Sequence, residues 1–306
     1  MRARRDIQAS NKAMAAAAAH PVRTLRELVT SLEAAITLAL ADPAPQAVHK
    51  LRTTSRRIEA QLELLALLLD LPGHAKPAKT VHKLLRKLRR AAGRVRDLDV
   101  QFDLVPFQSD EANHLRSLFK RRRKRAAKEL LAAIDQRQTK LTRALEALLE
   151  ALAPAESLTL PAARLEQLIL DWYARRAPAT AKQNHRQLHD TRKAAKLARY
   201  MAESARSTRT VARTFESLQQ SGGDWHDWLT LADIAQHELG DSSPLAQDFT
   251  RRSKRSLAAY QRHLRSLPKF VAQHPASSIQ PLAPRHVVGD DRARLHPSRH
   301  RRDIGV

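Results

Sequence analysis

The segment LRRAAGRVRD at residues 88–97 has a counterpart in LQQSGGDWHD at residues 218–227. The matched positions are Leu88 with Leu218, Gly93 with Gly223, and Asp97 with Asp227. The same shift of 130 residues, from 88 to 218, carries Phe119, Arg121, Arg122, Lys124 and Arg125 onto Phe249, Arg251, Arg252, Lys254 and Arg255. A constant register over separate segments indicates an internal repeat. We therefore expect one four-helix unit to occur twice.

Apolar residues at helical spacing, bounded by proline and glycine, predict helices along most of the chain. The expected ranges are 21–41, 45–70, 78–103, 110–152 with a break near 137, 161–176, 182–206, 208–221, 225–238 and 244–267. The expected fold class is all-α, with helical bundles at residues 21–153 and 154–267. A basic N-terminal extension at residues 1–20 and an irregular basic C-terminal tail at residues 268–306 are expected to flank them.

The composition favours packed helices and points to an anionic partner. Hydrophobic residues make up 42% of the chain and only 7 of 306 residues are glycine, which favours helices over sheet or disorder. Lys and Arg total 55 against 31 Asp and Glu, a net charge of +24. Such an excess attracts polyanions, so nucleic acid, an anionic membrane and polyphosphate all qualify. The absence of cysteine excludes disulfides and thiolate metal sites, and no apolar run approaches the ~18 residues of a membrane span.

Two histidine-containing segments carry dense basic stripes. They are VHKLRTTSRRIE at residues 48–59 and LHDTRKAAKLARYMAE at residues 188–203. In each, basic residues follow a histidine by three and seven positions, giving His49, Arg52 and Arg56, and His189, Arg192 and Lys196. Positions i, i+3 and i+7 share one face of an α-helix. Each segment is therefore expected to present a basic face beside its apolar face.

Further basic rows occur on other expected helices. They are Lys83, Arg86 and Arg90, then Arg121, Lys124 and Arg125, and finally Arg251, Lys254, Arg255 and Arg262. A single row of this kind is usually a solvated surface. Here the acids are too few to interleave, and like charges ~4 Å apart repel by about 1 kcal/mol in water. Repetition across several helices favours an anion-binding site.

The two histidine segments, together with RDLDV at residues 96–100, resemble the CHAD family, the conserved histidine α-helical domain. The resemblance covers roughly residues 20–267. It implies two four-helix bundles related by pseudo-two-fold symmetry, with a basic central cleft that binds inorganic polyphosphate. The residues expected to bind are His49, Lys50, Arg52, Arg56, Arg57, Lys83, Arg86, Arg90, Arg121, Lys124, Arg125, His189, Arg192, Lys193, Lys196, Arg199, Tyr200, Arg251, Lys254, Arg255 and Arg262.

The two halves depart from each other at several of these positions. Glu59 and Ala60 stand where the second half has Arg199 and Tyr200. In the next helix, Glu216 and Gln220 replace Arg86 and Arg90. The halves are therefore expected to contribute unequally to binding.

The sequence gives little support to an enzyme. The phosphate-binding loop G-x-x-x-x-G-K-[ST] is absent, as is the Glu-x-Glu-x-Lys motif of triphosphate tunnel enzymes. His226 and Asp227 form an HD dipeptide, but a metal hydrolase site needs further His and Asp ligands. Asp227 is instead interpreted as a polar anchor for a helix or a basic neighbour, and Trp172, Trp225 and Trp228 as packing residues. No catalytic residue, metal ion or cofactor is expected.

The expected function is non-catalytic binding of polyphosphate by a cytoplasmic protein, with targeting to polyphosphate granules. One alternative is binding of the nucleic-acid phosphate backbone, which needs only Arg and Lys. The aromatic content of 4% leaves little for base stacking. A second alternative is an adaptor for an acidic protein partner. An unperturbed histidine would add a hydrogen-bond donor to the site below pH ~6.5.

Overall fold

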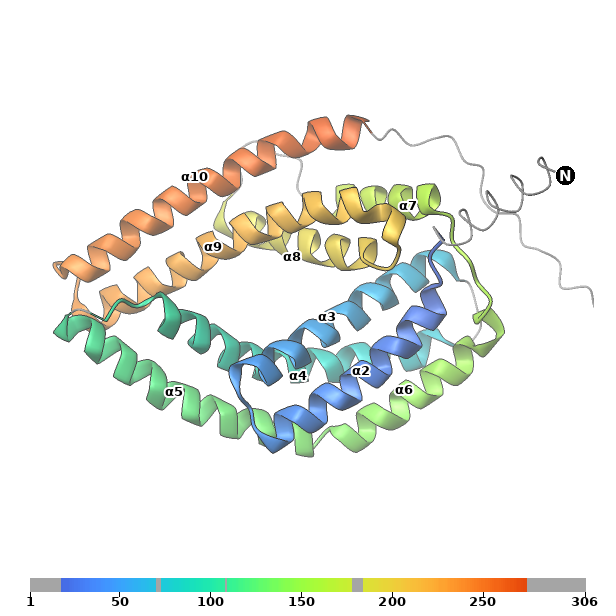
Figure 1. Cartoon of the computed structure of the whole chain (residues 1–306), viewed down its shortest axis with the longest axis horizontal. Helices are drawn as coiled ribbons and strands as arrows, with labels where there is room; N and C mark the ends of the chain where they lie inside the picture. The colour runs from blue at the N-terminus through green and yellow to red at the C-terminus, as the bar shows by residue number, and fades with distance from the viewer. Residues whose placement is uncertain (1–17, 70–72, 108, 178–183, 274–306) are drawn as a thin grey trace, which may run out of the picture. The chain divides into compact units, whose positions relative to one another are not determined.

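The fold is given by a computed structural model that describes residues 18–69, 73–107, 109–177 and 184–273. These residues form nine α-helices, two 3₁₀ turns and no strand, so the all-α prediction is confirmed for them. The helices of Figure 1 are α2 (Pro21–Ala41), α3 (Pro45–Leu68), α4 (Ala75–Leu104), α5 (Asp110–Asp135), α6 (Gln138–Leu152), α7 (Ala162–Arg176), α8 (His185–Ala202), α9 (Arg209–Leu239) and α10 (Pro244–Gln273). The 3₁₀ turns are η1 (Ala153–Ala155) and η2 (Arg206–Thr208).

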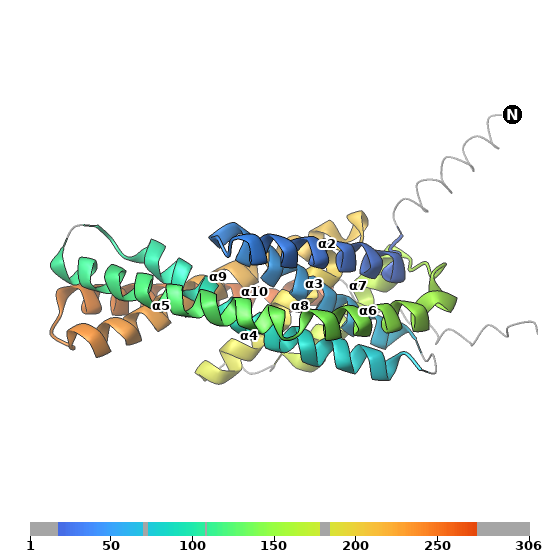
Figure 2. The same ribbon diagram turned by 90° about the horizontal axis from the view of Figure 1, so that it is seen from below.

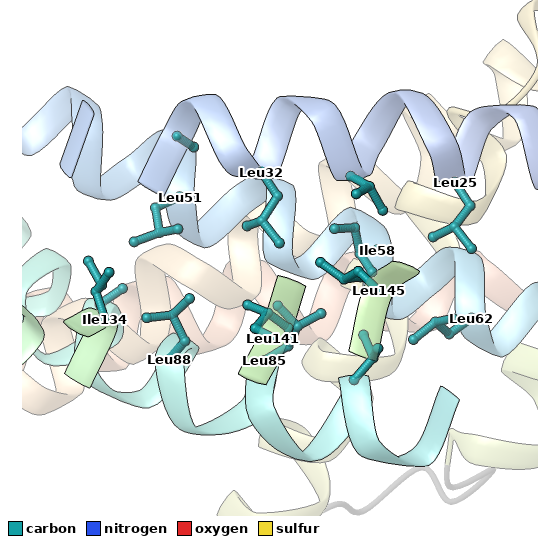
Figure 3. Packing of buried hydrophobic residues seen from close by; sticks show 14 of the residues in the cluster. Leu25, Leu32, Leu51, Ile58, Leu62, Leu85, Leu88, Ile134, Leu141 and Leu145 are labelled. Carbon is teal, nitrogen blue, oxygen red and sulfur yellow. The ribbon is translucent and has the colours of Figure 1, made fainter. Parts of the chain in front are cut away.

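The first hydrophobic core lies among α2, α3, α4, α5 and α6. Apolar residues three and four positions apart give each helix one buried stripe, such as Leu25, Val29 and Leu32 on α2. Figure 3 shows Leu25 and Leu32 turned toward side chains of α3, α4 and α6 between the helices. Burying one leucine is worth roughly 1.5–3 kcal/mol, so the core decides which face each helix turns inward. The charged faces of these helices are therefore turned toward solvent or toward the helices that follow residue 153.

The second core is formed by α7, α8, α9 and α10 and also takes in part of α3. Its largest side chains are Trp172, Trp225 and Tyr260, each exposed by 2% or less, which confirms the packing prediction for the two tryptophans. Ala60 and Leu64 of α3 are fully buried in this core. Helix α3 therefore packs into the first core with one face and into the second with another.

One predicted helix break is present and another is wrong. The break expected near residue 137 separates α5 from α6, which overlap in line in Figure 2 but meet at an angle in Figure 1. The interruption expected between residues 221 and 225 does not occur, because α9 runs unbroken across Gly222 and Gly223. A β-carbon on Gly222 would lie 2.9 Å from the Tyr260 ring and 3.1 Å from Cγ of Arg192. Gly222 therefore serves the close approach of α9 to its neighbours and does not end the helix.

The C-terminal boundary also differs from the prediction. Helix α10 continues through Pro268 to Gln273, so the irregular tail expected from residue 268 does not begin there. A proline removes one helical hydrogen bond, which bends a helix without always ending it. The expectations for residues 1–17 and 274–306 lie outside the described residues. No helix within the described ranges combines the length and apolar character of a membrane span.

Candidate functional site

A cavity of about 520 Å³ lies among α3, α4, α8 and α9, where the two histidine helices pack against each other (Figure 1). Its volume is in the usual range of ligand sites, about 300–1,000 Å³. The lining consists of His49, Arg52 and Arg56 of α3; Arg96, Asp97, Val100 and Leu104 of α4; His189, Arg192, Lys193 and Lys196 of α8; and Gln219, Gln220, Gly223, Asp224, His226, Asp227 and Trp228 of α9.

Seven of the predicted binding residues line this cavity. They are His49, Arg52, Arg56, His189, Arg192, Lys193 and Lys196. The predicted set omitted Arg96 and the polar wall supplied by α9. Gln219, Gly223 and His226 stand at i, i+4 and i+7, so the helical spacing would have placed them on one face. The expected helix break at this point hid that spacing.

The other predicted residues lie outside the cavity lining. Arg57 and Arg199 both bond Glu203, at 3.1 Å and 2.8 Å, and Arg199 also lies 2.8 Å from Glu216. Tyr200 is buried, with each of these two guanidinium groups 5.6 Å from its ring. The remaining side chains are exposed on α3, α4, α5 and α10: Lys50, Lys83, Arg86, Arg90, Arg121, Lys124, Arg125, Arg251, Lys254, Arg255 and Arg262.

Arg52 and Arg192 each approach a glycine of the next helix from a wall of the cavity. Each lies across a glycine and near an aspartate of the facing helix: Gly93 and Asp97 of α4 for Arg52 of α3, and Gly222 and Asp227 of α9 for Arg192 of α8. Nη2 of Arg52 is 3.7 Å from the Asp97 carboxylate. The glycines let each arginine stem lie close to the facing helix, and the carboxylates attract the guanidinium charge. The interpretation of Asp227 as an anchor for a basic neighbour agrees with its attraction for Arg192.

Glu59 holds Arg56 at the end of the α3 stripe. Arg56 donates to one carboxylate oxygen of Glu59 at 2.8 Å, while the other oxygen accepts from Arg89 at 2.6 Å and lies 3.1 Å from Nε2 of His82. Burial raises the pKa of Glu59, but the His82 hydrogen bond and the charges of Arg89 and Arg56 outweigh it and lower the pKa to about 2. Glu59, which stands where the second half has Arg199, is therefore ionised and anchors Arg56.

The three histidines of the cavity are neutral at pH 7. Burial and the charges of Lys193 and Arg192 lower the pKa of His189 to about 4. Burial and the charge of Arg192 lower the pKa of His226 to about 3, and the two rings lie 5.0 Å apart between centroids. Burial and the charges of Arg96 and Arg52 lower the pKa of His49. In the free protein His189 and His226 therefore gain their second proton well below the pH ~6.5 expected of an unperturbed histidine, and His49 gains it below that pH.

The cavity carries six basic side chains against three carboxylates. The basic residues are Arg52, Arg56, Arg96, Arg192, Lys193 and Lys196, and the acids are Asp97, Asp224 and Asp227. Among the described residues, no cluster of three or more His, Cys, Asp or Glu is arranged to hold a metal ion. Guanidinium and ammonium groups on packed helices offer charge-assisted hydrogen bonds to negatively charged oxygens. The fold and cavity therefore define an all-helical protein with a cation-rich site that can hold an anion.

Comparison with known proteins supplies the family. The model of the CHAD domain matches residues 23–236, and the chain belongs to this family. Its structure is similar to the crystal structure of the CHAD domain from the plant Ricinus communis, with a TM-score of 0.60 and 19% identity over 86% of this chain and 93% of that chain. It is also similar to PptA from Streptomyces chartreusis, with a TM-score of 0.55 and 17% identity over 80% of this chain and 98% of that chain. These identities show a shared fold alone, and the search of curated proteins found no match.

Proposed function

We propose that this chain binds inorganic polyphosphate in the cavity and does so without catalysis. The observation that carries the proposal is the convergence of six basic side chains from α3, α4 and α8 on one cavity. Each phosphate unit of the polymer presents negative oxygens, so neighbouring units can meet different cations at the same time. The resemblance of the histidine helices to the CHAD family supports the same ligand.

The arginines suit this ligand better than a diffuse positive surface would. A guanidinium presents donors in a planar fork that matches the geometry of phosphate oxygens. Arg52 and Arg56 already have carboxylate neighbours, Asp97 at 3.7 Å and Glu59 at 2.8 Å, which restrict where their guanidinium groups lie. A partly ordered side chain loses less freedom when the ligand binds. The basic rows exposed on α4, α5 and α10 are proposed to attract the polymer at longer range, where salt screens them.

The proposal includes an internal duplication that builds the two sides of the site. Its support is that Arg52 and Arg192 each lie near an aspartate, Asp97 and Asp227, that the repeat register pairs. The glycine beside Arg192 is Gly222, one residue before Gly223, the counterpart of Gly93. The shift between the two arginines is 140 residues, and the shift between Asp97 and Asp227 is 130. Binding by both halves would retain the protein on polyphosphate granules.

The direct test is a titration with polyphosphates of graded length beside single-stranded oligonucleotides of matched charge. Affinity should rise with polyphosphate length until the site is filled and should fall with salt, the log–log slope growing by about 0.7 for each phosphate neutralised. Equal affinity for the oligonucleotide would favour the nucleic-acid alternative. Capture of an acidic protein, with no preference for long polyphosphate, would favour the adaptor alternative.

A charge-matched pair of variants tests whether the cavity is the site. The cavity variant replaces Arg52, Arg56, Arg192 and Lys196 with alanine. The control replaces four basic residues outside the lining, all exposed, namely Arg23, Lys140, Arg143 and Arg175. Charge-assisted hydrogen bonds contribute about 1.5–3 kcal/mol each, so the cavity variant should lose at least about 100-fold in affinity and the control far less. Equal losses, with both variants folded by circular dichroism, would show that only total charge matters.

A further inference from the structure

Lys196 is a lysine set among arginines. It lines the cavity from α8 and is only partly exposed. Arg52 and Arg56 of α3 and Arg192 of its own helix line the same cavity, and their positive charges act on its ammonium. Asp227 of α9 is the carboxylate that attracts it. Four basic side chains from α3 and α8 therefore share the cavity.

The remaining charged and titratable groups of the lining do not cancel this excess. Helix α4 supplies Arg96 and Asp97, helix α8 adds His189 and Lys193, helix α9 adds His226 and Asp224, and helix α3 adds His49. The imidazoles are neutral at pH 7, for the reasons given above. One of the acids, Asp97, already faces Arg52 at 3.7 Å. The empty cavity is therefore strongly positive around Lys196.

The four clustered cations differ in one chemical respect. A guanidinium keeps its proton at any pH a folded protein meets, whereas an ammonium releases its proton when it is buried near other positive charges. Lys196 is thus the group whose deprotonation relieves the repulsion. Burial and the charges of Arg52, Arg192 and Arg56 accordingly lower the pKa of Lys196 to about 7.

We propose that Lys196 couples anion binding in this cavity to proton uptake, so that a phosphate polyanion binds together with one proton. The proton passes from solvent to Nζ of Lys196, which then donates to a phosphate oxygen as an ammonium. This inference rests on the proposed function, since it assigns to the same site a response to pH.

The expected direction follows from linkage. A ligand that prefers the protonated form of a group binds more weakly as that group loses its proton in the free protein. Affinity for polyphosphate should therefore fall as pH rises, approaching about tenfold per pH unit above pH 8. Lys196→Arg keeps its charge throughout this range, so this variant should bind with little dependence on pH.

The first experiment is calorimetry with a long-chain polyphosphate at pH 8, in two buffers of different ionisation enthalpy. The difference in heat gives the number of protons taken up. Because Lys196 has a pKa of about 7 in the ligand-free protein, uptake should be about 0.9 proton per site in the natural protein and near zero in Lys196→Arg. His189 and His226 do not interfere, because their pKa values of about 4 and 3 lie far below pH 8, and the pKa of His49 is likewise lowered by burial and by the charges of Arg96 and Arg52.

The matched control is Lys193→Arg. Lys193 lines the cavity from the same helix, but its side chain is 50% exposed and lies 3.3 Å from Asp190. This variant should keep the proton uptake of the natural protein. Loss of uptake in Lys193→Arg, or full uptake in Lys196→Arg, would overturn the assignment to Lys196.

A second measurement separates this inference from the proposed function. In the free protein labelled with ¹³C at the lysine ε-carbons, the resonance missing from Lys196→Arg identifies Lys196, and its titration gives the pKa directly. Titration near pH 7 supports the inference even if polyphosphate does not bind and the proposed function fails. Titration above pH 9.5, or tight polyphosphate binding without proton uptake, overturns the inference and leaves the proposed function standing.

Discussion

Glu59 is a single carboxylate that serves three partners, and its burial makes each of them depend on it. Its side chain contacts Arg56, Arg89 and His82 while only 8% exposed. Arg89 is itself 7% exposed, and one of its terminal nitrogens has no hydrogen-bond partner. Without the carboxylate, Arg89 would hold a buried charge with its main compensation gone. Glu59 therefore joins α3 to α4 through Arg89 and His82, and it also holds the guanidinium of Arg56.

The first prediction is that Glu59→Gln destabilises the fold strongly. Removing one partner of a buried ion pair costs about 3–5 kcal/mol because the other charge is left uncompensated. The free energy of unfolding, measured by urea at pH 7, should fall by this order. Glu63→Gln is the control, since Glu63 is 28% exposed and bonds the exposed Arg176, and it should lose at most about 1 kcal/mol. Equal effects would show that Glu59 is not the anchor described.

At the scale of the helix, Gly222 and Gly223 occupy adjacent positions of α9 and have opposite surroundings. A β-carbon at Gly222 would meet Tyr260 at 2.9 Å, whereas one at Gly223 would meet nothing within 4 Å. Adjacent glycines in the sequence predicted a helix break. The break is absent because tertiary contacts outweigh a propensity cost of only about 1 kcal/mol per glycine. The pattern within one helix cannot reveal a ring contributed by another.

The second prediction follows from that contrast. Gly223→Ala should stabilise the protein by about 0.5–1 kcal/mol, because alanine favours a helix over glycine where there is room. Gly222→Ala should destabilise it by about 1–3 kcal/mol, the usual range for overpacking, as Tyr260 and Arg192 are displaced. Thermal unfolding of the two variants measures both effects. Stabilisation by Gly222→Ala would mean that α9 and α10 have room to separate.

The basic rows show how far helical spacing predicts a site. The spacing of His49, Arg52 and Arg56 placed them on one face, and the corresponding face of α8 meets it in the cavity. The rows on α5 and α10 also have helical spacing, but they do not line the cavity. Spacing indicates which residues share a face, whereas the direction of that face depends on which neighbour covers the apolar stripe. That neighbour is a long-range contact, so the sequence predicted the helices better than the membership of the site.

Across the whole molecule, two partly buried histidines of the cavity, His189 and His226, make stability depend on acid. His189 and His226 have folded-state pKa values of about 4 and 3, below the value of about 6.5 for an unfolded histidine. Between these limits the unfolded chain binds more protons, so the free energy of unfolding falls as pH decreases. Their contribution to stability is complete above pH ~6.5 and is lost progressively toward pH 4.

The third prediction is that the double variant His189→Gln and His226→Gln loses less stability than the natural protein between pH 7 and pH 5. Urea unfolding at the two pH values gives the loss for each protein. His114→Gln is the control, because His114 is exposed on α5 and should leave the pH dependence unchanged. If the double variant loses as much stability as the natural protein, these two imidazoles are not the groups responsible.

The double packing of α3 affects the chain while it is being made. Helix α3 leaves the ribosome long before α7 and α8, yet Ala60 and Leu64 are buried in a core made mostly by the later half. Until then the nascent chain exposes an apolar strip bordered by Arg56 and Arg57. Exposed hydrophobic surface beside positive charge is a surface that chaperones bind and that promotes self-association. A fragment stopped before α7 is therefore expected to aggregate unless it is captured, and slowing translation after residue 153 should lengthen its dependence on chaperones.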